Sequence, residues 1–363
     1  MSSTDFEFYL PTRIIFGGGC SEQTFDLDCV KGKCCMLLSY AGFNNTAFIA
    51  KLQESCGELI NVDEFEENPS FSFVKKLGTM VSDKNVDTII AIGGGSSIDS
   101  AKAAAWLSAN PDWQIGSGDQ PDIPETSIVA IPTTSGTGSE VTPYAILTDE
   151  QTKQKQILNH QALFPKAAVC DPDFTITMPK GVTVNTGIDA LSHSIEAYMS
   201  TSCQGFMCQI ALESCRRIKE NLPLVIAEPS NSAAREAMML AALEGGIVLA
   251  RCGTVMVHAL GYCLTAKYGY PHGYSNALLL GGFVERLAAN GNQRAKGIMD
   301  IFDGDLSSFI TSCGIPASLP SGSVESSQVD AWVESGYNSY GRVKSITPIE
   351  KSDIKYMIEK IID

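Results

Sequence analysis

Short apolar runs alternate with helical stretches through the first half of the chain, and this alternation constrains the fold more than any other feature. Residues 34–39 (CCMLLS), 87–92 (DTIIAI) and 127–131 (SIVAI) form apolar runs that are typical of buried strands. Stretches with helical periodicity, such as residues 71–82 and 100–107, lie between them. Strands that alternate with helices favour a parallel sheet with crossover helices. The sequence therefore predicts an α/β domain with a parallel sheet.

The second half has a different pattern, because long helical segments such as residues 187–199 and 206–219 replace the alternation. The change falls near Pro179, and proline rarely continues a helix or a central strand. A chain of 363 residues also exceeds what one core usually holds. We therefore predict two domains: an α/β domain over residues 1–178 and an all-α domain over residues 179–363.

The charge balance argues against two classes of partner. The chain has 41 acidic and 26 basic residues and a formal net charge of −15, and such a surface repels nucleic acid and anionic lipid. No apolar run approaches the roughly 18 residues of a membrane span, and the first residues lack the pattern of a signal peptide. The 12 cysteines contain no C-x-x-C pair. We expect reduced thiols and a cytoplasmic protein.

A glycine-rich turn follows the run at residues 87–92 and marks a candidate nucleotide site. The turn reads GGGSS (residues 93–97) and opens a helix, where backbone N–H groups and the helix N-terminus favour a bound phosphate. A second polar loop, residues 132–142 (PTTSGTGSEVT), follows the next strand. Ligands of open parallel sheets lie at the carboxyl ends of strands, so the two loops favour an extended ligand such as a dinucleotide. The alternative is a tight strand-to-helix turn that binds nothing.

The end of the second strand bears on the choice of nucleotide. An acidic residue there would accept hydrogen bonds from the ribose 2′-hydroxyl and repel a 2′-phosphate. The chain has Ser39-Tyr40-Ala41-Gly42 at this point, without an acid, and we count Ser39 among the candidate cofactor residues. This favours NADP(H). NAD(H) stays open, because no arginine stands in the stretch to take the phosphate.

Three of the four histidines lie in the helical half, and they suggest a metal site. Asp189 and His193 are four residues apart, which places both side chains on one face of a helix. His258 lies in an apolar helix (GTVMVHALG), and His272 lies in a loop (YPHG). One carboxylate and three imidazoles suit a divalent metal such as Fe²⁺ or Zn²⁺. The alternative is that each of these residues is an ordinary core or surface residue.

A series of motifs, in order along the chain, resembles the iron-containing alcohol dehydrogenase family. The motifs are PTRIIFGGG, GGGSSIDSAK, IPTTSGTGSEVT, VCDPDFT, GIDALSHSIEAY and the block VHALG…YPHGYSNALLL. Two details, the turn at residues 39–42 and the stretch LTAKYG at residues 264–269, look closer to the butanol-dehydrogenase branch of that family. The resemblance covers nearly the whole chain.

The resemblance implies a dehydroquinate synthase-like architecture, in which a dinucleotide-binding α/β domain (residues 1–178) precedes an all-α metal-binding domain (residues 179–363). It implies that the metal ligands are Asp189, His193, His258 and His272. It implies that the pyrophosphate is held by Gly94, Gly95, Ser96 and Asp99. The other matched cofactor positions are Thr133, Thr134, Thr137, Thr142, Lys155 and Val182. Members of the family are usually homodimers or larger homo-oligomers.

The activity that the resemblance implies is interconversion of an alcohol with its aldehyde or ketone. Hydride passes to or from nicotinamide while the metal polarises the oxygen. Many members have a second histidine where this chain has Tyr262, which is therefore a candidate hydrogen-bond donor or proton carrier. Arg251 also departs from the family. We hypothesise that Arg251 pairs with an anionic group of a small aldehyde; the alternatives are pairing with Glu244 or Glu196, or solvent exposure.

Two other functions are compatible with this architecture. A dehydroquinate synthase-like lyase would need several lysines or arginines around the metal, and the block GTVMVHALGYC offers almost none beyond the preceding Arg251. A non-catalytic nucleotide- or metal-binding sensor would not need to keep both a nucleotide cradle and four metal ligands. Net turnover of the nicotinamide separates both alternatives from a dehydrogenase.

Overall fold

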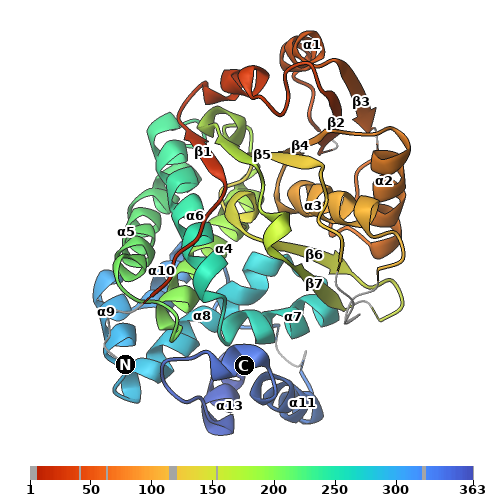
Figure 1. Ribbon diagram of the computed structural model, residues 1–363. Helices are drawn as coiled ribbons and strands as arrows, with labels where there is room; N and C mark the ends of the chain where they lie inside the picture. Colours follow the sequence, from red (N-terminus) through yellow and green to blue (C-terminus); the bar gives the residue numbers. More distant parts are fainter. Residues whose placement is uncertain are drawn as a thin grey trace. The chain divides into compact units, whose positions relative to one another are not determined.

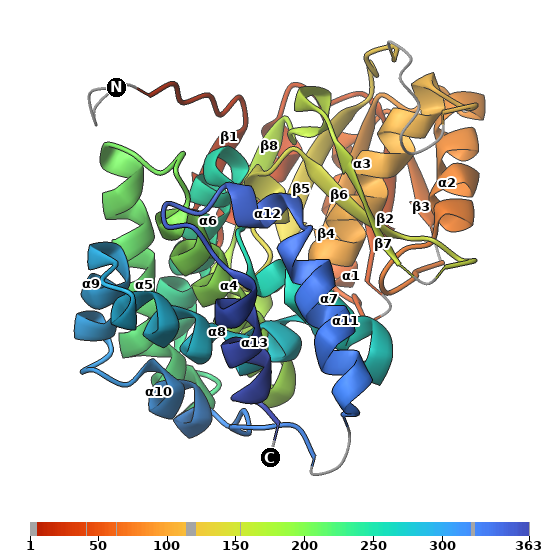
Figure 2. The same ribbon diagram turned by 90° about the horizontal axis from the view of Figure 1, so that it is seen from below.

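The computed structural model describes residues 6–40, 42–62, 64–113, 121–152, 154–320 and 324–362. Contacts between residues divide the chain into two units. The α/β unit comprises Leu10–Thr134 and Ser139–Ile176, and the helical unit comprises Met1–Tyr9, Ser135–Gly138 and Thr177–Asp363. Figures 1 and 2 show the elements of each unit in two orientations.

Parallel strands form the main sheet of the α/β unit, which confirms the predicted fold class. The order across this six-stranded sheet is β1-β8-β5-β4-β2-β3. Its strands are β1 (Arg13–Phe16), β2 (Cys34–Ser39), β3 (Glu58–Val62), β4 (Thr88–Gly93), β5 (Ser127–Pro132) and β8 (Ala167–Cys170). The helices of this unit are α1 (Thr46–Ser55), α2 (Phe71–Asp83) and α3 (Gly95–Ala109). An antiparallel hairpin of β6 (Tyr144–Thr148) and β7 (Lys155–Asn159), which sequence analysis did not predict, adds a second sheet.

Side chains of the central strands alternate between two apolar layers, as the pleat of a strand requires. Leu37 and Ile90 belong to the layer that also contains apolar residues of α1. Leu38 and Ile89, their neighbours along β2 and β4, belong to the layer that contains apolar residues of α2 and α3. Both faces of the sheet are therefore covered, which explains why β2, β4 and β5 read as nearly continuous apolar runs.

The helical unit is built around α4, which packs against α5, α6 and α8. Its helices are α4 (Lys180–Met199), α5 (Phe206–Ala227), α6 (Ser232–Cys252), α7 (Val257–Tyr268), α8 (His272–Ala289), α9 (Gln293–Ile301), α10 (Leu306–Ser312), α11 (Ser326–Tyr337), α12 (Tyr340–Val343) and α13 (Lys351–Glu359). The helix predicted over residues 206–219 continues through Pro223. Leu222 and Val225, on either side of that proline, are buried in the core, and their burial offsets the roughly 3 kcal/mol that an internal proline costs.

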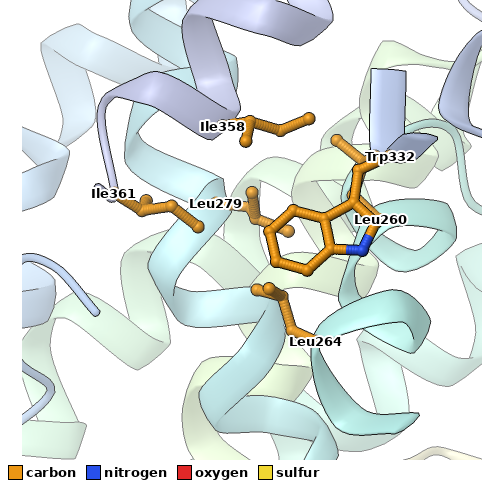
Figure 3. Close-up of a pocket in the computed structure, with 6 residues that line it drawn as sticks. All are labelled: Leu260, Leu264, Leu279, Trp332, Ile358 and Ile361. Carbon is orange, nitrogen blue, oxygen red and sulfur yellow. The ribbon is translucent and has the colours of Figure 1, made fainter. Parts of the chain in front are cut away.

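Helix α7 is held along its outer side by apolar side chains from later helices. Figure 2 shows α11 beside α7, and the two helices are in contact. Figure 3 shows the indole of Trp332 reaching in among leucines of α7 and α8. The residues that line this small hollow are Leu260, Leu264, Leu279, Trp332, Ile358 and Ile361. This packing holds the helix that carries His258 against α8, α11 and the end of the chain.

Within the described parts of the chain, no single helix is both long enough and apolar enough to cross a membrane. The pair α6 and α7, bent by 108° at its break, reaches that length and composition only when the two helices are taken together.

Candidate metal and nucleotide sites

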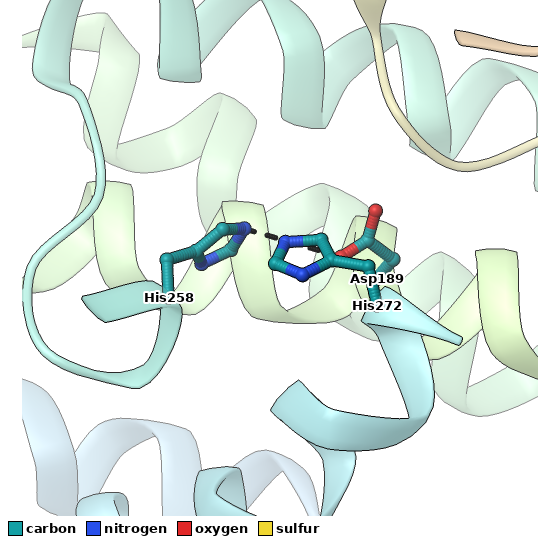
Figure 4. Close-up of side chains that lie close together, drawn as sticks. All are labelled: Asp189, His258 and His272. Carbon is teal, nitrogen blue, oxygen red and sulfur yellow. Dashed lines mark ion pairs between the residues drawn. The ribbon is translucent and has the colours of Figure 1, made fainter. Parts of the chain in front are cut away.

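Three helices of the helical unit bring one carboxylate and two imidazoles together. Asp189 lies on α4, His258 lies in the first turn of α7, and His272 begins α8. One ligand atom from each of them lies within 4.8 Å of the others, and Figure 4 shows the three side chains together, one from each helix. Asp189 and His258 are each 5% exposed. These atoms form a largely buried acceptor cluster of the kind that binds a divalent cation.

The amide of Asn276 contacts all three members of the cluster. Its Nδ2 lies 3.0 Å from Asp189 Oδ1, 3.3 Å from His258 Nε2 and 3.1 Å from His272 Nε2. An amide NH2 group only donates hydrogen bonds and has two hydrogens, so it can donate to two of these three atoms at a time. Carboxylate oxygen and imidazole nitrogen with lone pairs free for one centre fit a divalent transition metal. Sequence analysis missed Asn276, although its position four residues after His272 is the spacing that drew attention to Asp189 and His193.

His193 lies beside this cluster but is not one of the three residues whose ligand atoms converge. Its ring stacks on that of His258, with the ring centroids 4.7 Å apart. Its Nδ1 is buried and has no hydrogen-bond partner among the described residues. An orphaned buried nitrogen is costly and calls for an explanation. The role of His193 as a fourth ligand stays a prediction.

The charges around the cluster favour an ionised carboxylate and a neutral His193. Burial acts to raise the pKa of Asp189, but the imidazoles of His193, His272 and His258 outweigh it, and the pKa lies below its ordinary range. Burial lowers the pKa of His193, so its ring is neutral near pH 7. A deprotonated carboxylate and a neutral imidazole are the forms that bind metal.

Tyr262 and Arg251, the two predicted departures from the family, have different surroundings. Tyr262 lies one turn after His258 on α7, and its ring stacks on His272 with the centroids 4.8 Å apart and the planes 15° from parallel. Arg251 is exposed at the end of α6, and its Nε donates to the carbonyl oxygen of Glu7 at 2.8 Å. The structure therefore brings Tyr262 to the cluster. The contact of Arg251 with Glu7 gives no support to its hypothesised pairing with substrate.

The carboxylates that were considered as partners of Arg251 are bound elsewhere. Glu244 pairs with Arg217, at 3.3 Å. Glu196 contacts Nδ1 of His258 and is fully buried on α4. Of the alternatives in the sequence analysis, solvent exposure of Arg251 is the one that agrees with the structure. Sequence analysis gave Glu196 no part in the site, although it lies seven residues after Asp189, on the same face of α4.

In the α/β unit, the glycine-rich turn leads straight from β4 into α3. Gly94 is the N-cap of α3, and no side chain caps the helix. A Cβ atom on Gly94 would lie 3.3 Å from the side chain of Thr134, so the two polar loops meet at this point. The first backbone N–H groups of a helix have no partner within the helix and suit an anion. The binding of a pyrophosphate by Gly94, Gly95 and Ser96 stays a prediction.

Asp99 has a well-defined set of partners in the second polar loop and in β6. Its Oδ1 accepts a hydrogen bond from Ser139 Oγ at 2.5 Å, and its Oδ2 accepts one from the Ile146 N–H at 3.0 Å. Lys102 Nζ lies 3.9 Å from the carboxylate and donates to the carbonyl oxygens of Thr142 (2.8 Å) and Tyr144 (2.7 Å). These contacts make Asp99 and Lys102 part of the framework of the loop. The contacts of Asp99 are explained by this structural role alone. The predicted binding of the pyrophosphate by Asp99 stays a prediction.

The remaining predicted cofactor residues belong to both units. Ser39, Thr133, Thr142 and Lys155 lie in the α/β unit, and Thr137 and Val182 lie in the helical unit. Lys155 Nζ donates to Asn68 Oδ1 at 2.6 Å and to Thr148 Oγ1 at 3.1 Å. Burial lowers the pKa of Lys155. The contacts with a cofactor stay predictions for all six residues.

Glu140, a buried acid of the second polar loop, should make stability depend on pH. Burial raises the pKa of its carboxyl from 4.5 to about 7, against the opposing effect of Lys102. The folded protein then holds a proton that the unfolded chain releases, so this contribution to stability is complete below pH 4.5 and is lost as the pH rises through 7. Glutamine does not titrate, so as the pH rises over this range the free energy of unfolding of Glu140→Gln should increase by ~3 kcal/mol relative to that of the parent. Urea unfolding of both proteins across this range measures the difference.

Glu22→Gln is the control for this experiment, because Glu22 pairs with Lys51 on the surface. An exposed ion pair contributes little to stability, so its pH profile should follow that of the parent. Parallel profiles for Glu140→Gln and the parent would show that the carboxyl of Glu140 does not titrate in this window.

The fold, the two candidate sites and the comparison with known families together define the class of protein. One unit has a parallel sheet with a glycine-rich helix start, and the other holds a buried Asp/His cluster for a metal ion. Residues 11–172 match the iron-containing alcohol dehydrogenase family, and residues 183–362 match the C-terminal part of the Fe-containing alcohol dehydrogenase family. The chain therefore belongs to the iron-containing alcohol dehydrogenase family.

Three relatives show the range of this similarity. The chain is 38% identical to “Probable alcohol dehydrogenase EutG” of Escherichia coli (strain K12) over 53% of this chain and 50% of that one, so the match spans about half of that relative. It is 34% identical to an NADPH-dependent butanol dehydrogenase of Clostridium saccharobutylicum, over 75% of this chain and 72% of that one. A sulfoacetaldehyde reductase from Bifidobacterium kashiwanohense, solved in complex with NAD+, superimposes with a TM-score of 0.89 and 25% identity over 99% of each chain. Butanol dehydrogenase is thus one of several relatives at similar distance.

Proposed function

We propose that this chain is a metal-dependent NAD(P)(H) alcohol dehydrogenase or aldehyde reductase. The observation that carries the proposal is the convergence of ligand atoms from Asp189, His258 and His272, in a chain of this family. A bound divalent metal supplies Lewis acidity towards the alcohol or carbonyl oxygen, and a bound nicotinamide gives or takes the hydride. Fe²⁺ is the first candidate and Zn²⁺ the second, because both accept carboxylate and imidazole ligands.

The side chains of the helical unit would bind the metal and orient the groups around it. The proposed ligands are Asp189, His193, His258 and His272. Asn276 contacts three of them through one NH2 group and so limits their rotation. The ring of Tyr262 fixes the plane of His272 by stacking, and its hydroxyl is the candidate hydrogen-bond donor to the substrate oxygen.

The α/β domain, residues 1–178, would bind the nucleotide, and residues 179–363 would form the metal-binding domain. NADP(H) is the proposed nucleotide, because no acid follows β2 at Ser39; NAD(H) is the alternative. The proposed cofactor contacts are Ser39, Gly94, Gly95, Ser96, Asp99, Thr133, Thr134, Thr137, Thr142, Lys155 and Val182.

All 12 cysteines are free, which supports a reducing, cytoplasmic setting. A homodimer is the proposed assembly, on the strength of the family alone.

Metal removal should abolish oxidation of the nicotinamide. We would purify the protein without oxygen, load it with Fe²⁺, and follow NADPH and NADH absorbance with a panel of small aldehydes. The panel pairs neutral aldehydes with carboxylated, sulfonated and phosphonated ones of similar length, since one structural neighbour is a sulfoacetaldehyde reductase. We expect turnover with at least one aldehyde, a loss of at least ~100-fold after chelation, and recovery with Fe²⁺ or Zn²⁺.

The same assay separates the proposed reaction from the alternatives. A dehydroquinate synthase-like lyase or a non-catalytic sensor would bind nucleotide and metal without net oxidation of NAD(P)H. Turnover that survives complete removal of the metal would contradict the metal-dependent mechanism. A preference for anionic aldehydes that is unchanged in Arg251→Ala would end the hypothesis that Arg251 binds substrate.

A further inference from the structure

We propose that Glu196 is a positioning residue of the metal site, whose buried carboxylate holds the ring of His258 and the start of α7 in the orientation that metal binding needs. The inference deepens the proposed function and rests on it. Glu196 does not belong to the cluster whose ligand atoms converge. It acts through His258.

The first contact is between side chains. Glu196 Oε2 contacts Nδ1 of His258, and both residues are buried, with Glu196 0% exposed. A carboxylate oxygen only accepts hydrogen bonds, so Nδ1 of His258 must carry the hydrogen. In the neutral ring the lone pair then lies on Nε2, the nitrogen that faces Asp189 Oδ1 at 3.9 Å and the amide of Asn276 at 3.3 Å. The carboxylate thereby fixes the tautomer that presents a ligand atom.

The second set of contacts is with the backbone at the start of α7. Glu196 Oε1 accepts hydrogen bonds from the N–H groups of Val255 and Val257, both at 2.8 Å, and Oε2 accepts one from the His258 N–H at 3.3 Å. The N-cap residue of α7, Met256, gives no side-chain cap. Glu196 thus supplies from α4 the cap that α7 lacks, and the helix N-terminus in turn stabilises the negative charge.

Together these contacts tie one metal ligand to the helix that carries another. Glu196 lies seven residues after Asp189 on α4, which is close to two full turns, so both carboxylates lie on one face. A buried carboxylate without partners would be strongly destabilising. The four donors to Glu196 all belong to residues 255–258. The carboxylate of Glu196 therefore holds this segment in place relative to Asp189 on the same helix.

The test compares Glu196→Gln with Glu244→Gln in the full chain. Glutamine keeps the size of the side chain and one acceptor oxygen, but its NH2 group cannot accept the hydrogen bond from Nδ1 of His258. Glu244 is a partly buried glutamate of the same unit, paired with Arg217. We would measure the affinity for Zn²⁺ by competition with a chromophoric chelator, the absorption spectrum with Co²⁺, and the melting temperature without metal.

We expect Glu196→Gln to bind Zn²⁺ about 10- to 100-fold more weakly and to change the Co²⁺ spectrum, and Glu244→Gln to leave both unchanged. A purely structural role would lower the melting temperature and leave the affinity and spectrum of the folded protein as in the parent, and this result would overturn the inference. Failure of the parent itself to bind metal at Asp189 would instead refute the proposed function.

A second measurement on the unmodified protein covers the case in which Glu196→Gln does not fold. Long-range ¹H–¹⁵N spectra of ¹⁵N-histidine-labelled protein without metal distinguish the two tautomers of His258. For the neutral ring, a hydrogen on Nδ1 supports the inference, whereas a hydrogen on Nε2 contradicts it.

Discussion

Asp189→Ala should reduce kcat/KM for aldehyde reduction by about a thousandfold or more and leave the protein without bound metal. Asp189 supplies the negatively charged ligand atom of the cluster, and its Oδ1 is also an acceptor for Asn276. Without it, two or three neutral imidazoles remain to hold a divalent cation. The stabilisation that a metal gives to the developing charge is several kcal/mol, and each 1.36 kcal/mol is a factor of ten in rate. Metal content by mass spectrometry and steady-state kinetics measure the two losses separately.

Asp353→Asn is the matched control for this substitution. Asp353 is also a buried aspartate of the helical unit, 5% exposed, but it pairs with Arg286 and caps α13. We expect this variant to lose stability and to keep its metal and its kcat/KM per folded molecule. If Asp189→Ala retained stoichiometric metal and normal rates, the assignment of the cluster as the metal site would be wrong.

Gly273→Ala should be the most damaging small substitution near the cluster. Gly273 follows His272 in the first turn of α8, and a Cβ atom there would lie 2.0 Å from the carbonyl oxygen of Asn185 and 3.1 Å from Cβ of Asp189. The backbone of α4 cannot yield as a flexible side chain would, so α8 must move away from α4. We expect a loss of ~3 kcal/mol in the free energy of unfolding and a lower metal affinity, because the movement separates His272 from Asp189.

Gly297→Ala provides the comparison, since Gly297 lies inside α9 and a Cβ atom there would meet nothing within 4 Å. Alanine in an unobstructed helix interior is more stable than glycine by about 0.5–1 kcal/mol, so this variant should gain stability. Thermal unfolding with and without added metal measures both variants. Equal melting temperatures and equal metal content for Gly273→Ala and the parent would show that α8 does not need the close approach to α4.

Much of the fold follows from patterns that extend over a few residues. The apolar runs predicted β2, β4 and β5, because strands covered on both faces have no polar side to interrupt them. The order of the strands did not follow, since it depends on contacts between distant segments. Sequence analysis did not predict the β6–β7 hairpin. Its two strands, residues 144–148 and 155–159, are only partly buried, so they have no continuous apolar run to mark them. The helix predicted over residues 206–219 extends to Ala227 as α5, and buried side chains such as Leu222 and Val225 support this extension past Pro223.

The candidate site shows the same limit at the level of single residues. Four-residue spacing drew attention to Asp189 and His193, yet in the structure the ligand atom of Asp189 converges with His258 and His272. Spacing places two side chains on one face of a helix but does not say which other helix faces them. Arg251 contacts the carbonyl oxygen of Glu7, more than two hundred residues earlier in the chain. No local pattern in the sequence predicts a contact over that separation.

The cluster draws its ligand atoms from three separate helices, and this has a consequence for how the protein lasts in a cell. Asp189 and His258 are 69 positions apart (258 − 189), so an unfolded chain cannot present them together without closing a long loop. On the proposed function, a metal bound by both is therefore a cross-link that exists only in the folded state, and it stabilises that state by mass action. Metal supply then governs the lifetime of the protein as well as the reaction rate. In a cell short of metal, the metal-free protein would unfold more often, and proteases would degrade it first.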